Sequence, residues 1–259
     1  LATIAACLGT ANYPRVTAIT RDRAAAGIID TVAALDAPKE RPATLMVLWG
    51  HEYWALRYAQ TYEGRFPQLA LVDHNADMGA IVASGRRLWT PVATFYRLPP
   101  ATWEERLGAP VHLSSVGPGV VEISTAPVVA VGDVAAGPSL ALGDGLHIAS
   151  ATLRKRGDRA LVTVYWTATG APTRDFSVGV HLLTASPPDG PDDIAAQADQ
   201  SHPVGGWFPT TAWETGEVVR DDYVLAVPPG CAPVGVRVGL YHQADDGSFV
   251  NSPWLYLAW

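Results

Sequence analysis

The chain has few charged residues and no extended basic region. Charged residues make up 17% of its 259 positions, less than the quarter that is usual in soluble domains, and the formal net charge is −7. No basic run exceeds Arg154-Lys155-Arg156. A protein that binds nucleic acid neutralises phosphates with clustered lysines and arginines, so we expect no nucleic-acid partner.

Motifs for cofactors and metals are also scarce. The two cysteines, Cys7 and Cys231, lie far apart without metal-ligand spacing. They indicate neither a disulfide framework nor a zinc site, and their redox state stays open. The glycines of "VASGRR" and "SSVGPGVV" form no dinucleotide-binding or Walker motif, and no serine stands in a nucleophile elbow. We therefore expect no cofactor or bound metal, and no motif identifies a catalytic residue.

The apolar run that opens the chain is too short to cross a bilayer. It reads "LATIAACLG", about nine residues, whereas a spanning helix takes about 20. It also lacks the basic flank of a signal peptide. Two interpretations stay open: the final turns of a membrane helix that begins upstream, or a buried strand.

Apolar, glycine and proline residues are plentiful. Hydrophobic residues reach 48%, and 24 glycines with 21 prolines suit many short elements joined by tight turns. Between residues 22 and 127, helical and strand patterns alternate. Helices are predicted at 21–35, 51–64, 78–87 and 101–108, and strands at 44–50, 68–73 and 90–98. Apolar strands without strict alternation indicate a parallel sheet covered on both faces, hence a small Rossmann-like three-layer α/β unit. Residues 111–117 and 119–125 are expected to complete the sheet at one edge.

The second half of the chain has the period of two that is typical of half-buried strands. Apolar residues alternate in "LVTVYWT", "FSVGVHLL" and "VGVRVGLY", with turn clusters between them. The pattern predicts an all-β sandwich of roughly seven strands. We place the Rossmann-like α/β domain at residues 1–126, a linker at 127–145 and the β-sandwich at 146–259.

One group of polar side chains is placed as in the active sites of α/β proteins, after the carboxyl ends of predicted strands. His51 and Glu52 follow the first predicted strand, and Asp73, His74, Asn75 and Asp77 follow the second. If the strands are neighbours, both groups line one crevice at the carboxyl edge of the sheet. Such a crevice would bind a metal or divide acid and base roles. In the alternative, Glu52 caps its helix, Asp73 and Asn75 shape a turn, and the histidines face solvent.

A second candidate site is the turn-rich stretch at residues 199–230. Trp207 and Trp213 would stack a sugar ring while His202 and neighbouring carboxylates hold its hydroxyls. In the structural alternative, which we favour, the stretch crosses between the two sheets. Trp213 then closes the core and its indole N–H meets a backbone carbonyl.

The same stretch resembles a known family. The residues Trp213, Gly216, Glu217, Val219, Asp221, Tyr223, Leu225 and Pro228, followed by Val238 to Tyr241, match a W-x-x-G-E-x-V-x-D-x-Y-x-L-x-x-P signature with a V-G-L-Y strand. This signature is found in the C-terminal immunoglobulin-like domain of many bacterial membrane proteins of the GT-C glycosyltransferase type, relatives of the protein O-mannosyltransferases. The "NYP" segment and the α/β pattern after it are similar to the region that follows the last membrane helix in a related family. The acidic first-loop motif on which GT-C catalysis depends is not in this sequence.

The resemblance implies a non-catalytic region on the extracytoplasmic face of the cell membrane. It would be attached through helices encoded upstream, and it would recognise or position a glycan, a lipid-linked sugar or an acceptor. Two alternatives stay open: a metal- or carboxylate-dependent hydrolase or transferase that uses the His51/Glu52/Asp73/His74/Asp77 crevice, and a secreted glycan-binding protein. We expect the full-length gene to encode several apolar segments of about 18 or more residues before this point.

Overall fold

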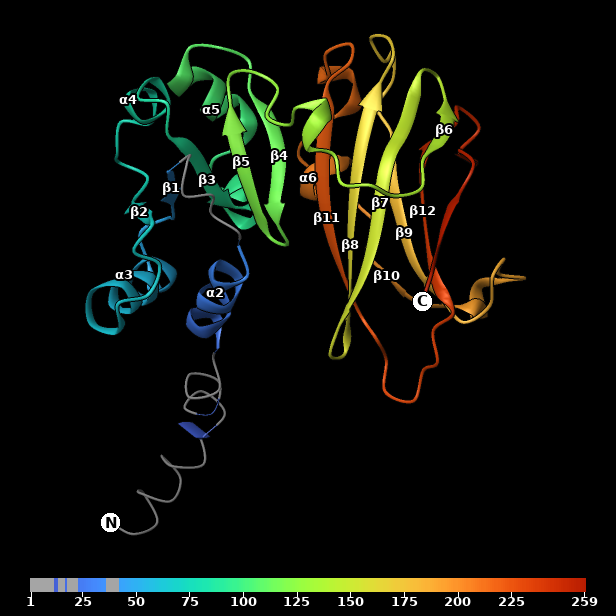
Figure 1. Ribbon diagram of the computed structural model, residues 1–259, viewed down its shortest axis with the longest axis horizontal. Helices are drawn as coiled ribbons and strands as arrows, with labels where there is room; N and C mark the ends of the chain where they lie inside the picture. Colours follow the sequence, from blue (N-terminus) through green and yellow to red (C-terminus); the bar gives the residue numbers. More distant parts are fainter. Residues whose placement is uncertain (1–11, 14–16, 18–22, 36–41) are drawn as a thin grey trace.

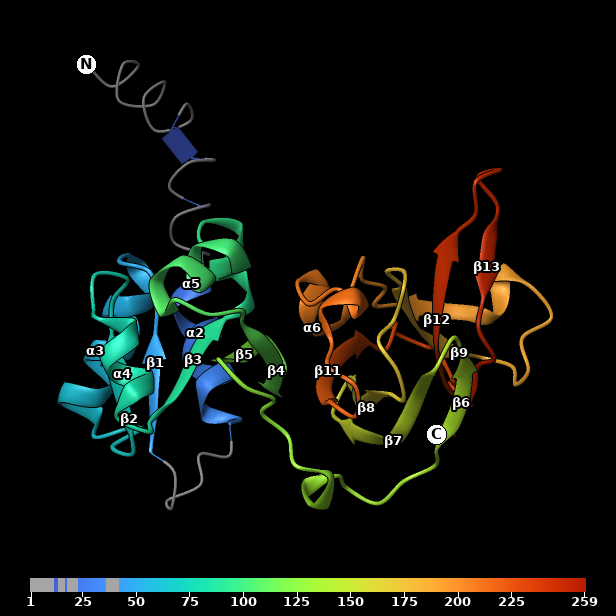
Figure 2. The same cartoon turned by 90° about the horizontal axis from the view of Figure 1, so that it is seen from above.

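The computed structural model describes residues 12–13, 17, 23–35 and 42–259. The described chain is a mixed α/β structure with three sheets. One sheet belongs to the first half of the sequence and two belong to the second half. The unit formed by the first half lies beside the unit formed by the second half (Figures 1 and 2). The segment 1–11, which includes the opening apolar run, and Cys7 with it, lie outside the described residues.

The first sheet has five strands in the order β2-β1-β3-β5-β4. Its strands are β1 (Ala43–Met46), β2 (Leu69–Val72), β3 (Arg87–Pro91), β4 (His112–Gly117) and β5 (Val120–Ser124). β1 pairs in parallel with both β2 and β3, whereas β5 is antiparallel to its neighbours β3 and β4. The expected parallel core and the expected edge formed by the last two strands are therefore confirmed.

Helices cover both faces of this sheet. They are α2 (Ala24–Ala33), α3 (His51–Glu63), α4 (Met78–Ala83) and α5 (Pro100–Leu107). Leu45 packs with Ile28 and Leu56 of α2 and α3, whereas its neighbour Met46 packs with Met78 and Trp103 of α4 and α5. Successive side chains of a strand point to opposite faces, so the apolar run of β1 supplies both cores.

The third strand differs from its prediction. The sequence pattern placed it at 90–98, but β3 ends at Pro91, and residues Val92–Tyr96 form the 3-10 helix η1. Thr94 and Phe95 of η1 are buried while Tyr96 is 77% exposed. A 3-10 turn that is buried on one side and a strand with alternate burial can have the same proportion of apolar residues. The apolar pattern of such a short segment therefore does not distinguish the two.

The second half forms two antiparallel sheets that pack face to face. One contains β6 (Leu140–Gly143), β7 (Leu146–Arg156), β8 (Arg159–Ala168) and β11 (Val218–Ala226). The other contains β9 (Ser177–Leu183), β10 (Ile194–Gln197), β12 (Gly235–Gln243), β13 (Phe249–Asn251) and β14 (Leu255–Ala258). The alternating residues named by the sequence pattern all enter one core: Val162, Val164, Trp166, Phe176, Val178, Val180, Leu182, Val236, Val238 and Leu240. The predicted inward faces are confirmed.

The two halves share a buried boundary. β4 is an edge strand of the first sheet and β11 an edge strand of the second, and the two edges face each other (Figures 1 and 2). The buried cluster that contains Leu113 of β4 continues into Val219 of β11. The connection between the halves, residues 125–139, is exposed along most of its length and includes the short 3-10 helix η2 (Val131–Asp133).

Candidate functional site

The predicted crevice residues follow neighbouring strands, as expected, but most of them have local structural roles. The Asp73 carboxylate accepts the N–H of Asn75 at 2.8 Å, which shapes a turn. The Asp77 carboxylate accepts the N–H of Ala80 at 2.9 Å and so caps the N-terminus of α4. The carbonyl of His74 accepts a hydrogen bond from Arg106 of α5 at 2.8 Å.

The other two crevice residues lie at the start of helix α3. His51 is exposed at the first position of α3. Glu52 lies in the first turn, where its carboxylate interacts favourably with the positive end of the helix dipole. Glu52 also lines a cleft between α2 and the β-sandwich. Among the residues that the structure describes, no three His, Cys, Asp or Glu side chains are close enough to hold a metal ion.

The two tryptophans of the turn-rich stretch do not form an exposed platform. Trp213 is only 3% exposed and belongs to the sandwich core, so it presents no ring face to a sugar. Its indole nitrogen is buried without a hydrogen-bond partner, so the expected bond to a backbone carbonyl is not formed. Trp207 is half-buried against the first half of the chain, with its ring 5.2 Å from Tyr96 and 5.7 Å from Phe95 of η1. His202 is partly buried just before the short helix α6 (Pro203–Gly206).

The polar residues of the signature hold this stretch in place. The Asp221 carboxylate accepts the N–H of Val204 at 2.8 Å and the hydroxyl of Tyr223. Val204 has a φ of 56°, a left-handed conformation that a β-branched residue rarely adopts, so the buried carboxylate and the packing around it maintain the turn. Burial raises the pKa of Asp221 from 3.8 to about 7, despite the two hydrogen bonds that favour its charged form. Asp221 therefore has a structural role.

The most conspicuous exposed feature lies on α3 and the turn just before it. Trp49, Trp54, Tyr58 and Tyr62 are 56%, 51%, 57% and 76% exposed. Together with the partly buried Tyr53 we call these residues the aromatic face. The Trp49 ring stacks on Tyr53 at 5.4 Å and meets Trp54 edge-on at 4.9 Å, and the Tyr58 and Tyr62 rings are 5.1 Å apart. Residues 54, 58 and 62 recur every four positions, and this spacing alone would have predicted one helix face.

The helix turns these rings outward because its other side is already occupied. Leu56 packs with residues of α2 and the sheet, and Ala59 is fully buried. The Gln60 amide donates to the carbonyl of Leu69 at 2.9 Å. A left-handed Gly64 ends the helix. The aromatic face is therefore carried on a rigid, well-anchored element.

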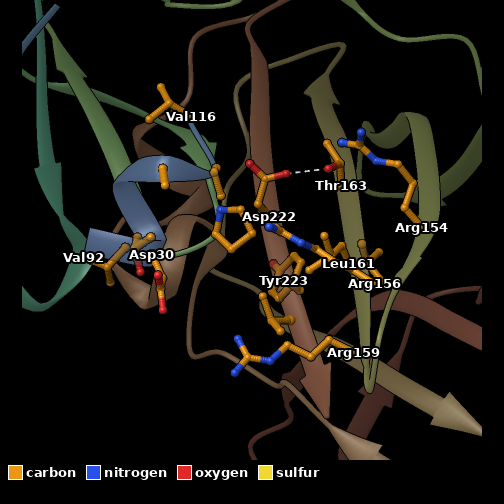
Figure 3. Close-up of a pocket in the computed structure, with 18 of the residues that line it drawn as sticks. Asp30, Val92, Val116, Arg154, Arg156, Arg159, Leu161, Thr163, Asp222 and Tyr223 are labelled. Carbon is orange, nitrogen blue, oxygen red and sulfur yellow. Dashed lines mark hydrogen bonds between the residues drawn. The ribbon is translucent and has the colours of Figure 1, made fainter. Parts of the chain in front are cut away.

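A second feature is a cleft of about 1460 Å³ between the two halves (Figure 3). One wall is formed by α2 and the ends of β3 and β4, and the other by the outer surface of β7, β8 and β11. Seven separate stretches of sequence contribute to it, so no local motif could have indicated it.

Within the described residues, every helix is too short or too polar to span a lipid bilayer.

No family model and no curated protein matches the chain. Among solved structures, the wild-type OgpA of Akkermansia muciniphila has 12% sequence identity and a TM-score of 0.27, over 44% of this chain and 28% of the OgpA chain. A catalytically inactive OgpA in complex with an O-glycopeptide has 13% identity and a TM-score of 0.25, over 48% and 29% of the two chains. The matches span less than a third of OgpA, and at these TM-scores they carry no argument about fold or activity.

Proposed function

We propose that this chain is a non-catalytic region that recognises a glycan or a glycosylated acceptor through the aromatic face of α3. The single observation that carries the proposal is the row of exposed tryptophan and tyrosine rings on an anchored helix. Exposed apolar patches on folded proteins mark binding sites. A pyranose ring has an apolar C–H face that packs on an aromatic ring, and its hydroxyls need polar partners nearby.

The composition of the aromatic face fits a sugar better than a lipid surface. Each ring of Trp54, Tyr58 and Tyr62 carries its own hydrogen-bonding atom, and the exposed Arg57 and Glu63 on the same helix supply charged donors and acceptors. A helix that lies in a membrane interface presents leucine, phenylalanine or tryptophan on one face and an excess of lysine and arginine on the other. On α3 the one exposed lysine or arginine, Arg57, is matched by the exposed carboxylate of Glu63, so the helix has no basic excess.

The resemblance of residues 213–241 to the C-terminal domain of GT-C-type membrane proteins suggests the kind of protein to which this chain belongs. In this proposal the chain belongs to the extracytoplasmic part of a membrane glycosyltransferase-like protein, with the first sheet as its Rossmann-like unit and the sandwich as its immunoglobulin-like domain. Its task is to hold a glycan or acceptor for a catalytic centre elsewhere in the protein. The local roles of Asp73, Asp77 and Asp221 as turn, cap and loop anchor support a binding role for this region rather than catalysis.

An oligosaccharide array followed by calorimetric titration of the best binder tests the proposal. Trp54→Ala and Tyr58→Ala should each weaken binding at least about tenfold, and both should fold normally because the side chains are exposed. Tyr256→Ala is the matched control, since Tyr256 is an exposed aromatic residue on the sandwich. Absence of any glycan binding would overturn the proposal. Equal binding by the variants would also overturn it, as would Trp54-dependent binding to lipid vesicles without any to glycans.

A further inference from the structure

Three arginines gather at the end of one β-hairpin. Arg154 and Arg156 stand near the end of β7, and Arg159 begins β8 after a tight turn at Gly157-Asp158. Arg156 and Arg159 are directly opposite in the antiparallel register, and Arg154 is two positions before Arg156, so the three lie on the same face of the sheet. We call them the arginine hairpin.

This face is the one that forms the sandwich wall of the cleft. Figure 3 shows the three arginines on the strand side of the cleft, across from α2 with its Asp30. Lys155, between them in sequence, points to the other side of the sheet, where its amine lies 4.5 Å from the centre of the Trp259 ring. Lys155 and Asp158 of the hairpin are also among the lining residues, but the guanidinium groups of the three arginines supply the positive charge on this face of the sheet.

The arginine hairpin has no counter-charge of its own. In the part of the chain that the structure describes, none of its three guanidinium groups has an ion-pair or hydrogen-bond partner, Asp158 of the turn included. Like charges directly opposite each other in a β-ladder are destabilising. The arrangement thus costs folding free energy, and a bound anion would offset that cost.

A neighbouring arginine in the same cleft shows the contrast. Arg220 of β11 is paired with Asp222, with 3.0 Å between its Nη2 atom and a carboxylate oxygen. The Asp222 side chain is 2% exposed and accepts the hydroxyl of Thr163 at 2.5 Å, which fixes it in the wall. Arg220 is neutralised, whereas the arginine hairpin is not.

We propose that the cleft binds an anionic ligand whose phosphate or carboxylate group is held by Arg154, Arg156 and Arg159. Arginine forks match the oxygens of both groups in bidentate geometry. The cleft is far larger than a single oxyanion, so the ligand has an extended body. That body meets the opposite wall, where Asp30 and Glu52 would accept hydrogen bonds from hydroxyl or amine groups. The site is separate from the aromatic face, because Trp54, Tyr58 and Tyr62 do not line the cleft.

Calorimetric titration with two probes tests the inference and distinguishes its two sources of negative charge. The probes are pyrophosphate, which carries phosphate groups, and trigalacturonate, which carries carboxylates. Each is titrated at two salt concentrations, about 20 mM and about 150 mM, because salt screens charge contacts at this exposed hairpin. Arg156→Gln and the double variant Arg154→Gln/Arg159→Gln should weaken the binding of at least one probe by about tenfold or more. Arg97→Gln, an exposed arginine outside the cleft, is the control and should bind like the parent.

Thermal unfolding of the free protein gives an independent readout. Removing one of two opposed like charges should raise the Tm of Arg156→Gln by about 1–3 °C, and each probe that binds should raise the Tm of the parent more than that of the variant. Binding of neither probe would overturn the inference, as would binding that the arginine variants leave unchanged. Loss of glycan binding in Trp54→Ala with intact pyrophosphate binding would support the two sites as separate.

Discussion

The Nδ1 atom of His112 lies 2.8 Å from the Oε1 atom of Glu217, and this buried contact joins the two halves of the molecule. His112 begins the edge strand β4, and Glu217 immediately precedes β11. The other Glu217 oxygen accepts the N–H of Glu214 at 2.9 Å. One carboxylate thus satisfies a turn of the sandwich and a side chain of the neighbouring sheet.

Glu217→Ala should lower the free energy of unfolding by about 1–3 kcal/mol, because it leaves the buried ring nitrogen of His112 and the partly buried N–H of Glu214 without this acceptor. Urea unfolding measures the loss. Glu214→Ala is the control: its carboxylate lies 3.5 Å from His112 but its side chain is 64% exposed, so the cost should stay below about 1 kcal/mol. Equal effects of the two substitutions would contradict the role given to Glu217.

Limited digestion with elastase should cut within residues 125–139, where small residues are exposed. The linker predicted at residues 127–145 implies few contacts between the two halves. The shared cluster around Leu113 and Val219 shows otherwise, so the two fragments should elute together in gel filtration. Fragments that separate without denaturant would show that the boundary contacts are weak.

Trp213→Ala should lower the free energy of unfolding by about 3–5 kcal/mol, since a buried indole is replaced by a cavity. Trp54→Ala, at an exposed position on α3, should change it by no more than about 0.5 kcal/mol. Chemical denaturation of both variants makes the comparison. A similar loss in the two would mean that the aromatic face is part of the folding core.

Asp221→Asn should flatten the dependence of stability on pH. The pKa of Asp221 is about 7 in the folded chain against 3.8 for the ordinary group, because burial disfavours the charged form. The folded state therefore binds this proton more tightly, so the carboxyl adds stability as pH falls from 7 toward 4 and loses it as pH rises through 7. Between pH 8 and pH 5.5 this amounts to about 2 kcal/mol.

The asparagine variant cannot titrate, and it should lack this component while it still accepts the N–H of Val204. The measurement is urea unfolding at both pH values for the parent and the variant, because the difference between them cancels other titrating groups that the variant shares with its parent. An unchanged difference would show that Asp221 is charged in the folded protein at pH 5.5, despite its burial beside Asp222 and Tyr223.

Local patterns were sufficient for most elements and for the inward faces of the sandwich. The alternation at Val162, Val164 and Trp166 identified residues that are buried, because a strand has only two faces and one must leave water. The same reasoning failed for residues 90–98. A short apolar segment can be buried as a strand or as a 3-10 turn, and its composition does not distinguish them.

Periodicity and turn residues act over a few positions, so local sequence was sufficient to predict most of the strands and helices. Which side chains are available to a ligand depends instead on how the whole chain packs. Trp213 and Trp54 are the same residue type in similarly polar surroundings, yet one fills the core and the other faces solvent. The cleft likewise brings Asp30 opposite Arg156, residues that no local pattern relates. The reason is physical: exposure and electrostatic environment depend on which distant elements pack together, and that choice is made by the whole buried surface rather than by any one segment.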